Sequence, residues 1–258
     1  METDGTRRFS SRVADYIRYR PSYPGEAIGL LERECGLAPG AAVADIGSGT
    51  GLLAGLFLQL GCEVFGVEPN GDMRRAGERI LSTEWRFHSI NGRAEQTGLP
   101  DASVDLVAAG QSFHWFDREA AKVEFRRIAR PPGWVALLWN ERLVEGRFLE
   151  EYEALLHRYC PEYASVDHRR MDADIMDAFF GPRNWRLATF PNDQRFDLEG
   201  LMGRLHSSSY APAAGSAEHE ALNAEVARLF AECQQDGLVA WRHETKVYYG
   251  ALGANAVS

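Results

Sequence analysis

The sequence predicts an α/β fold in which a doubly wound, mostly parallel sheet is followed by a mostly helical region. Two observations lead to this prediction. The first 140 residues alternate short apolar runs with amphipathic stretches, the rhythm of β-α-β units. In addition, residues 45–51 form a glycine-rich turn between an apolar run and a helical stretch, the place where open α/β sheets bind ligands.

The elements of the first part follow from periodicity and from turn residues. Asn70 is an expected helix N-cap, because its side chain can accept hydrogen bonds from the first turn. Strands are expected over 41–46, 62–68, 85–90, 104–109 and 134–139, with helices over 51–60, 70–81 and 118–129.

The rhythm changes after Asn140, where aromatic and apolar residues follow helical stripes. Helices are expected around 148–159, 171–180 and 222–233, and strands over 185–196, broken at Pro191, and over 240–249. We therefore predict a core with an N-terminal flap over 1–140, a helical cap with one strand over 141–237, and a final strand over 238–258 that completes the sheet. The alternative is that these helices simply cover a face of the sheet.

Composition narrows the possible partners. The formal net charge of −9 disfavours nucleic acid and anionic membranes. No apolar run approaches the ~20 residues of a membrane helix, and the polar N-terminus does not resemble a signal peptide. The four cysteines are widely spaced and do not cluster with histidines, so we expect reduced thiols, a cytoplasmic location and no metal. The oligomeric state is not indicated.

The turn over 45–51, Asp-Ile-Gly-Ser-Gly-Thr-Gly, favours S-adenosylmethionine (SAM) over a dinucleotide. Glycines allow a tight turn and close approach of a ligand to the main chain, and the helix that follows offers unpaired N–H groups. The dinucleotide fingerprint G-x-G-x-x-G places its third glycine where this chain has Leu52. Asp45 would repel a pyrophosphate but suits the positively charged methionine end of SAM.

Glu68 ends the second expected strand, about 20 residues after the glycines, where a carboxylate can accept both ribose hydroxyls. This feature is shared by NAD and SAM sites. The alternative is that Glu68 only helps to cap the helix that starts near Asn70.

The ordered set of motifs resembles the class I SAM-dependent methyltransferases. The set comprises 45–51, Glu68-Pro69 with Met73, Asn91 to Glu95, Leu99-Pro100 and 104–107. The segments 16–24, 111–116 and 139–142 are similar to the subgroup of small-molecule enzymes that includes trans-aconitate methyltransferases. The resemblance covers roughly residues 9–140 and implies a Rossmann-like sheet of the class I methyltransferase type.

The resemblance also implies the cofactor residues. The glycine turn would meet the methionine end, Glu68 the ribose and Met73 the adenine, and the alternative for Met73 is that it only fills the core. The full set is Asp45, Gly47, Ser48, Gly49, Thr50, Glu68, Pro69, Met73, Arg93, Ala94, Glu95 and Gln111.

Candidates on the substrate side follow the fourth and fifth strands. His114 is the candidate general base, with packing as the alternative. Trp115 or Phe113 could face the sulfonium. Arg142 could bind a substrate carboxylate, or could be a surface arginine paired with Glu141 or Glu145. Aromatic residues of the N-terminal flap complete the set: Tyr16, Tyr19 and Tyr23.

The sequence therefore predicts a SAM-dependent methyltransferase acting on an unidentified small molecule. A sulfonium already activates its methyl group, so neither a triad nor a metal is required. The alternatives are an NAD-dependent oxidoreductase, disfavoured by Leu52, and a non-catalytic SAM-binding regulator, disfavoured by the intact set of Asp45, the glycines and Glu68.

Overall fold

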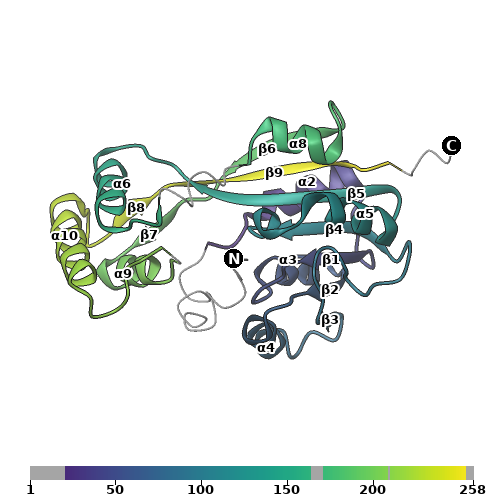
Figure 1. Ribbon diagram of the computed structural model, residues 1–258, viewed down its shortest axis with the longest axis horizontal. Coiled ribbons are helices and arrows are strands. Elements are labelled where there is room, and N and C mark those ends of the chain that lie inside the picture. The colour runs from purple at the N-terminus through teal and green to yellow at the C-terminus, as the bar shows by residue number, and fades with distance from the viewer. Residues whose placement is uncertain (1–20, 164–170, 209, 254–258) are drawn as a thin grey trace.

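The main sheet has seven strands in the order β3-β2-β1-β4-β5-β9-β6 (Figure 1). The structure is a computed structural model that describes residues 21–163, 171–208 and 210–253. The first five strands of the sheet are parallel to one another, and β9 lies antiparallel between β5 and β6. This confirms the predicted α/β fold of the class I methyltransferase type.

The strands of the sheet lie close to their expected positions. Apolar residues of β1 and β4 are buried on both faces, as helices on both sides of a parallel sheet require. The strands are β1 Ala42–Ile46, β2 Glu63–Val67, β3 Phe87–Ile90, β4 Val104–Gly110, β5 Ala129–Arg142, β6 Trp185–Pro191 and β9 His243–Ala251.

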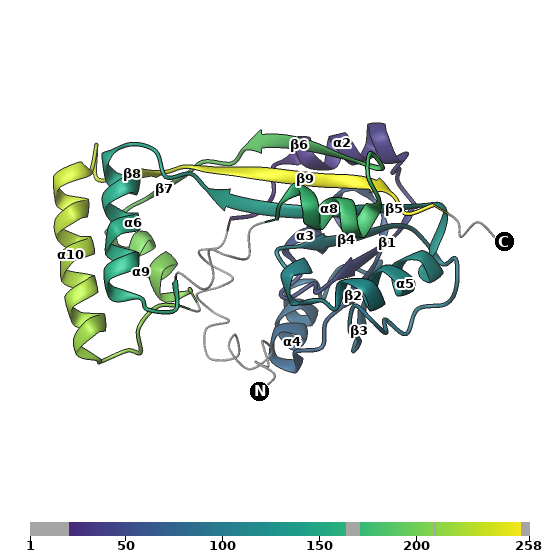
Figure 2. The same ribbon diagram turned by 45° about the horizontal axis from the view of Figure 1, so that its top comes forward.

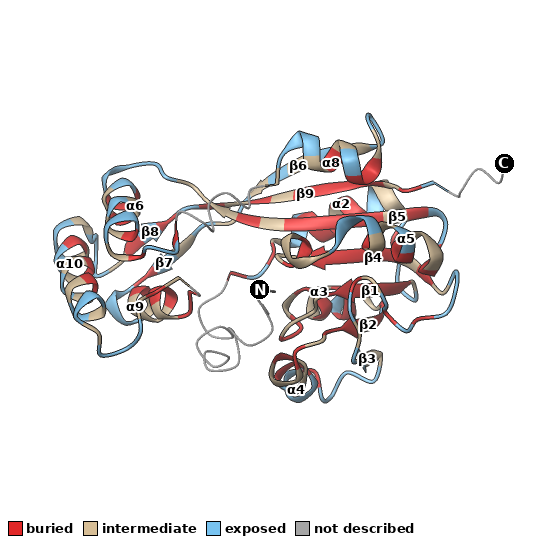
Figure 3. Ribbon diagram, viewed as in Figure 1, coloured by how far each residue is buried: buried red, intermediate tan, exposed pale blue. Residues whose placement is uncertain are grey.

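Helices cover both faces of the sheet, so that most of its residues are buried (Figure 3). On one face, α2 (Gly25–Cys35) and α3 (Leu52–Leu60) share a core with β1 and β4. On the other face, α5 (Arg118–Ile128) and α8 (Ala173–Phe180) pack together around Phe125 and Phe179. Helix α4 (Gly71–Ile80) lies against β3. Helix α2 was not expected from the sequence.

A second unit stands beyond the carboxyl ends of the parallel strands (Figures 1 and 2). We call it the small unit. It comprises α6 (Arg147–Tyr159), α9 (Leu198–His206), α10 (Ala217–Cys233), β7 (Gln194–Phe196) and β8 (Val239–Trp241). Its own apolar core is built around Trp241, whose ring contacts those of Phe148, Tyr152 and Phe196.

The chain is divided differently from the expected boundaries at 140 and 237. Strand β5 runs on to Arg142, and region 141–237 contains two strands instead of one, because Pro191 ends β6 and β7 follows it. Helix α8 and strand β6 belong to the main sheet, since Met176, Phe179 and Phe180 pack in its core. Strand β8 pairs with β7 in the small unit, so only β9 completes the main sheet.

Because the small unit has its own core, we expect Leu229→Ala to loosen it without loosening the sheet. Leu229 is fully buried in α10, and truncation of such a leucine costs about 2–5 kcal/mol. Amide hydrogen exchange should become faster in α6 and α10 and stay unchanged in β1 and β4. The exposed Ala224→Ser in the same helix is the control. Equally faster exchange in β1 and β4 would show that the two units open together.

Candidate cofactor and active site

The glycine turn lies at the carboxyl end of β1 and leads into α3, as expected. Gly47 has φ 68°, in the left-handed region that favours glycine. A Cβ on Gly47 would lie 2.5 Å from Cβ of Ser112, whose hydroxyl donates to the Ile46 carbonyl at 2.7 Å. The turn is therefore packed directly against the segment that follows β4, and a side chain at Gly47 has no room.

Glu68 is tied to the glycine turn by main-chain hydrogen bonds. Its Oε2 accepts from the Gly49 N–H at 2.9 Å, and its Oε1 accepts from the Asn70 N–H at 2.8 Å. Burial raises the pKa of Glu68, while these two bonds and Arg74 lower it. Each carboxylate oxygen still has a second lone pair for a ribose hydroxyl. Capping of α4 belongs to Asn70, whose side chain accepts from Asp72 and Met73.

Asp45 brings a buried acidic group to the same place. Burial is the main reason why its pKa rises from 3.8 to about 7; the Glu68 carboxylate raises it too, and a hydrogen bond from the Ala54 amide lowers it. Among the described residues, Oδ2 of Asp45 and Oγ1 of Thr50 are buried without a hydrogen-bond partner. Buried polar atoms are normally satisfied, so these two suit a ligand that brings a cation and polar atoms to the turn.

The remaining predicted cofactor residues lie around this edge. Met73 is buried, and its Cε would be 3.4 Å from a Cβ on Gly49, so it packs on the turn. Ala94 is buried, whereas the Arg93 side chain is largely exposed and pairs with Glu95 at 3.6 Å. Three others lie at ends of strands: Ser48 beside Val67, half-buried Pro69, and Gln111 after β4.

His114 lies in a short 3-10 helix, η3 (Phe113–Trp115), directly after β4. Its ring is half-buried between Trp115, at 4.6 Å, and Trp139, at 5.1 Å. Phe113 is 1% exposed and packs edge-on against Phe179 at 4.8 Å. Phe113 is therefore a core residue, and of the two aromatic candidates for a sulfonium contact only Trp115 remains at the edge.

Two of the predicted substrate residues, Tyr23 and Arg142, make contacts within the cores of the protein. Tyr23 is buried in the core under α2 and α3, and a Cβ on Gly110 would clash with its hydroxyl. Tyr16 and Tyr19 lie outside the described residues. Arg142 pairs with Glu153 and with the Tyr163 hydroxyl at 2.9 Å, inside the small unit.

The sequence suggested Glu141 or Glu145 as partners for Arg142, but these pair with Lys246 and Arg242. Glu153 of α6 replaces them because the fold brings α6 to the end of β5, a tertiary contact that local sequence does not reveal.

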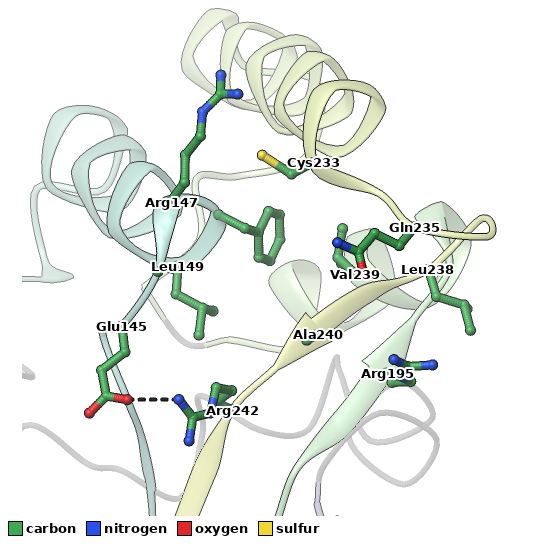
Figure 4. A pocket seen from close by; sticks show the side chains of 12 residues that line it. Glu145, Arg147, Leu149, Arg195, Cys233, Gln235, Leu238, Val239, Ala240 and Arg242 are labelled. Carbon is green, nitrogen blue, oxygen red and sulfur yellow. Dashed lines mark hydrogen bonds and ion pairs between the residues drawn. The ribbon is translucent and has the colours of Figure 1, made fainter.

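A hollow of about 210 Å³ lies on the small unit, between the start of α6, the end of α10 and the β7–β8 ladder (Figure 4). No cofactor residue lines it. Two of its three arginines already have counter-ions, since Arg242 pairs with Glu145 and Arg147 pairs with Glu232. This hollow is separate from the site at the glycine turn.

Comparison with known proteins agrees with this geometry. Residues 44–137 match a family model described as a methyltransferase domain. This part of the chain is therefore similar to methyltransferase domains. The matched residues include the glycine turn, Glu68 and His114, and SAM is the methyl donor of this family.

Two relatives, both uncharacterized methyltransferases, illustrate this similarity. A methyltransferase of Mycobacterium tuberculosis is 38% identical over 54% of this chain and 54% of its own length, so the chain spans about half the length of that relative. One from Schizosaccharomyces pombe is 27% identical over 85% of this chain and 86% of its own.

The solved structure of a candidate type II methyltransferase from Anaeromyxobacter dehalogenans shares the fold. It superposes with a TM-score of 0.63 and 24% identity, covering 91% of this chain and 98% of that one. In the part of the chain that the structure describes, no helix has the length and apolar character needed to cross a membrane.

The raised pKa of Asp45 gives a test of the site in the ligand-free protein. The folded pKa of about 7 exceeds the usual 3.8, so the folded state binds this proton more tightly than the unfolded state. Tighter binding of this proton adds to the free energy of unfolding. The contribution is fully present below pH 3.8 and is lost as the pH rises through 7. In Asp45→Asn the side chain at this position does not titrate, so the variant does not lose this contribution as the pH rises. The free energy of unfolding of the variant minus that of the parent should therefore increase by about 2–4 kcal/mol between pH 4 and 8.

Urea unfolding at several pH values measures this difference. Asp101→Asn, at a largely exposed carboxylate, is the control. Parallel pH profiles for the parent and Asp45→Asn would contradict the assigned pKa.

Proposed function

We propose that this protein transfers a methyl group from SAM to a small-molecule acceptor. One observation supports the proposal most strongly. The Glu68 carboxylate is held on the Gly49 amide, beside the buried Asp45 carboxyl, at the carboxyl edge of a parallel sheet. This arrangement supports the proposal because Glu68 can accept hydrogen bonds from ribose hydroxyls and Asp45 can attract a cationic ligand at the same glycine turn.

We propose that the cofactor residues named from the sequence hold SAM along this edge. When bound, SAM supplies an electrophilic methyl carbon attached to a sulfonium. Asp45 and Thr50 present buried polar atoms to the methionine end, and Glu68 accepts from the ribose. Met73 packs on the turn where a flat base can lie against it. The Asp45 and Glu68 carboxyl groups need no metal ion for these contacts.

The acceptor side of the proposal rests on the small unit. Strand β5 continues for four residues beyond Leu138, the partner of Gly110, which at ~3.3 Å a residue carries the chain about 13 Å past the end of β4. This extension carries the small unit beyond the edge of the sheet at which the glycine turn lies. We propose that this unit is the cap that excludes water and binds the acceptor.

Near the methyl group, His114 and Trp115 are the proposed residues. His114 follows β4 directly, and its ring is oriented by Trp115 and Trp139. A histidine there can remove a proton from an O–H or N–H acceptor as the new bond forms. Trp115 is half-buried beside it and can face a cationic sulfonium. Arg142, which Glu153 and Tyr163 hold in the small unit, acts in this proposal through the shape of the acceptor site.

The finer assignments belong to the same proposal. The motifs support a relation to the small-molecule subgroup that includes trans-aconitate methyltransferases. All four cysteines are free thiols, which suits the reducing cytoplasm. The net charge of −9 favours a small molecule over nucleic acid as the acceptor.

Calorimetry with SAM, S-adenosylhomocysteine and NAD tests the cofactor. We expect the first two to bind in the micromolar range and NAD not to bind. Glu68→Ala should weaken S-adenosylhomocysteine binding by about 1–3 kcal/mol, because it removes the ribose acceptor and leaves two amides unpaired. Gly49→Val should abolish binding, since φ is 57° there.

Glu63→Ala is the matched control for this test, because Glu63 starts β2, the strand that Glu68 follows, but is exposed and pairs with the surface residue His88. Tight binding of NAD without binding of SAM would contradict the proposed methyl transfer and would favour an NAD-dependent oxidoreductase.

Activity tests the role of His114. Acceptors come from a panel of small acids, phenols and amines, with formation of S-adenosylhomocysteine as the readout. With any acceptor found, His114→Ala should lower kcat by about 10²–10⁴-fold with little change in SAM affinity. His88→Ala, at a surface histidine of β3, should leave kcat unchanged. An unchanged kcat in His114→Ala would show that His114 has a packing role and does not act as a base.

A further inference from the structure

Three polar side chains meet where β5 and β9 leave the main sheet and continue into the small unit. They are Asn140 of β5, Asn192 between β6 and β7, and Thr245 of β9, which lies opposite Asn140 in the ladder. Asn140 is 9% exposed and Thr245 is fully buried. None of the three was singled out as functional in the sequence.

The hydrogen bonds of this cluster are mutually consistent. The Asn192 amide donates to the Ser22 carbonyl at 2.7 Å and to Oδ1 of Asn140 at 3.1 Å. The Asn140 amide donates to the same Ser22 carbonyl at 3.2 Å, and the Thr245 hydroxyl donates to Oδ1 of Asn140. A main-chain carbonyl can only accept, so both amide nitrogens must face Ser22, and this orientation leaves Oδ1 of Asn140 to accept.

Asn140 is also contacted from the cofactor edge. The Gln111 side chain donates to the Asn140 carbonyl at 2.8 Å, and the Gln111 amide donates to the Leu138 carbonyl at 3.0 Å. Gln111 has φ 55°, a left-handed conformation that is uncommon for a residue with a side chain. These contacts hold Gln111 in that conformation, so Asn140 connects the end of β4 with the other two polar residues.

The sheet narrows at this point. Pairing of β6 with β9 ends at Pro191 and Glu244, and Glu244 lies opposite Glu141, so beyond that row only β5 and β9 still pair, at Arg142 and His243. A two-stranded ribbon twists more readily than a wide sheet. Over the ~13 Å from Leu138 to Arg142, a bend of about 4° displaces the far end by ~1 Å, enough to cost ~10²-fold in a reaction that depends on alignment.

We propose that Asn140, Asn192 and Thr245 are positioning residues that set the small unit, and with it the acceptor, relative to the methyl group of the cofactor. Asn192 lies outside the two-stranded ribbon, and its side chain links the ribbon to the main chain at Ser22. We call this link the brace. The link to the acceptor rests on the proposed methyl transfer. The brace itself is a property of the ligand-free protein and can be measured without any acceptor.

Asn192→Asp is the sharpest variant. It keeps the size and shape of the side chain but replaces the amide donor with a carboxylate, which then faces two acceptors, the Ser22 carbonyl and Oδ1 of Asn140. The Thr245 hydroxyl, also at 3.1 Å, can donate to this carboxylate only by giving up its bond to Asn140. The matched control is Asn184→Asp, which removes one amide donor to the Phe180 carbonyl at the end of α8, away from the ribbon. Both positions lie in turns, and neither belongs to the proposed cofactor or catalytic residues.

Distances between spin labels report the position of the small unit. Labels on Arg79→Cys in α4 and Ala224→Cys in α10, both exposed positions, span the two units once Cys35 and Cys233 are replaced by serine. We expect Asn192→Asp to broaden the distance distribution by about twofold, while the control keeps the parent width. S-adenosylhomocysteine affinity, measured by calorimetry, should stay within about twofold of the parent in both.

An unchanged distribution in folded Asn192→Asp overturns the proposal. If this variant does not fold, Thr245→Val and Thr245→Ser replace it. The valine should broaden the distribution, and the serine, which keeps the hydroxyl, should not; equal widths overturn the proposal. If the parent itself fails to bind S-adenosylhomocysteine, the proposed function fails, while the distance measurement still decides whether the cluster positions the small unit.

Discussion

The antiparallel ladder between β5 and β9 is the interaction on which the rest of the structure depends. It runs from Trp134 and Ala251 inside the main sheet to Arg142 and His243 at the small unit. Within the sheet it joins the parallel strands to β6, and beyond the sheet it is the covalent and hydrogen-bonded support of the small unit (Figure 2). Because β5 is parallel to β4, its extension necessarily emerges at the carboxyl edge, where the glycine turn also lies.

This geometry separates two tasks. The main sheet holds the glycine turn rigidly, because β1 is buried on both faces and Glu68 links the turn to the end of β2. The small unit has a different core, centred on Trp241, and is joined to the sheet by the ladder, by its polar cluster and by the short segment between β6 and β7. Parts that bind the cofactor and parts proposed to select the acceptor can therefore differ in stability and in sequence without disturbing one another.

The main sheet and the small unit differ in whether a buried ionisable side chain has a counter-ion. In the sheet, Asp45 is buried without a positively charged partner among the described residues, and its pKa rises to about 7 as a result. In the small unit, the guanidinium of Arg142 is also buried but is matched by Glu153 and lies over the rings of Tyr152 and Trp241. A buried charge that lacks a partner costs stability, so the first arrangement suits a binding site and the second suits a core.

The sequence by itself determined the sheet and the cofactor edge. Periodicity located the five parallel strands, and the turn from Asp45 to Gly51 with Glu68 named the residues that gather there, because glycine turns, strand ends and N-caps are local features. Tertiary structure alone decided that α8 joins the sheet, that Phe113 is core, and that Arg142 pairs with Glu153. It also assembled Asn140, Asn192 and Thr245, which lie up to 105 residues apart in the chain. Their contacts depend on which strands become neighbours, and neighbouring strands are selected by the packing of the whole fold.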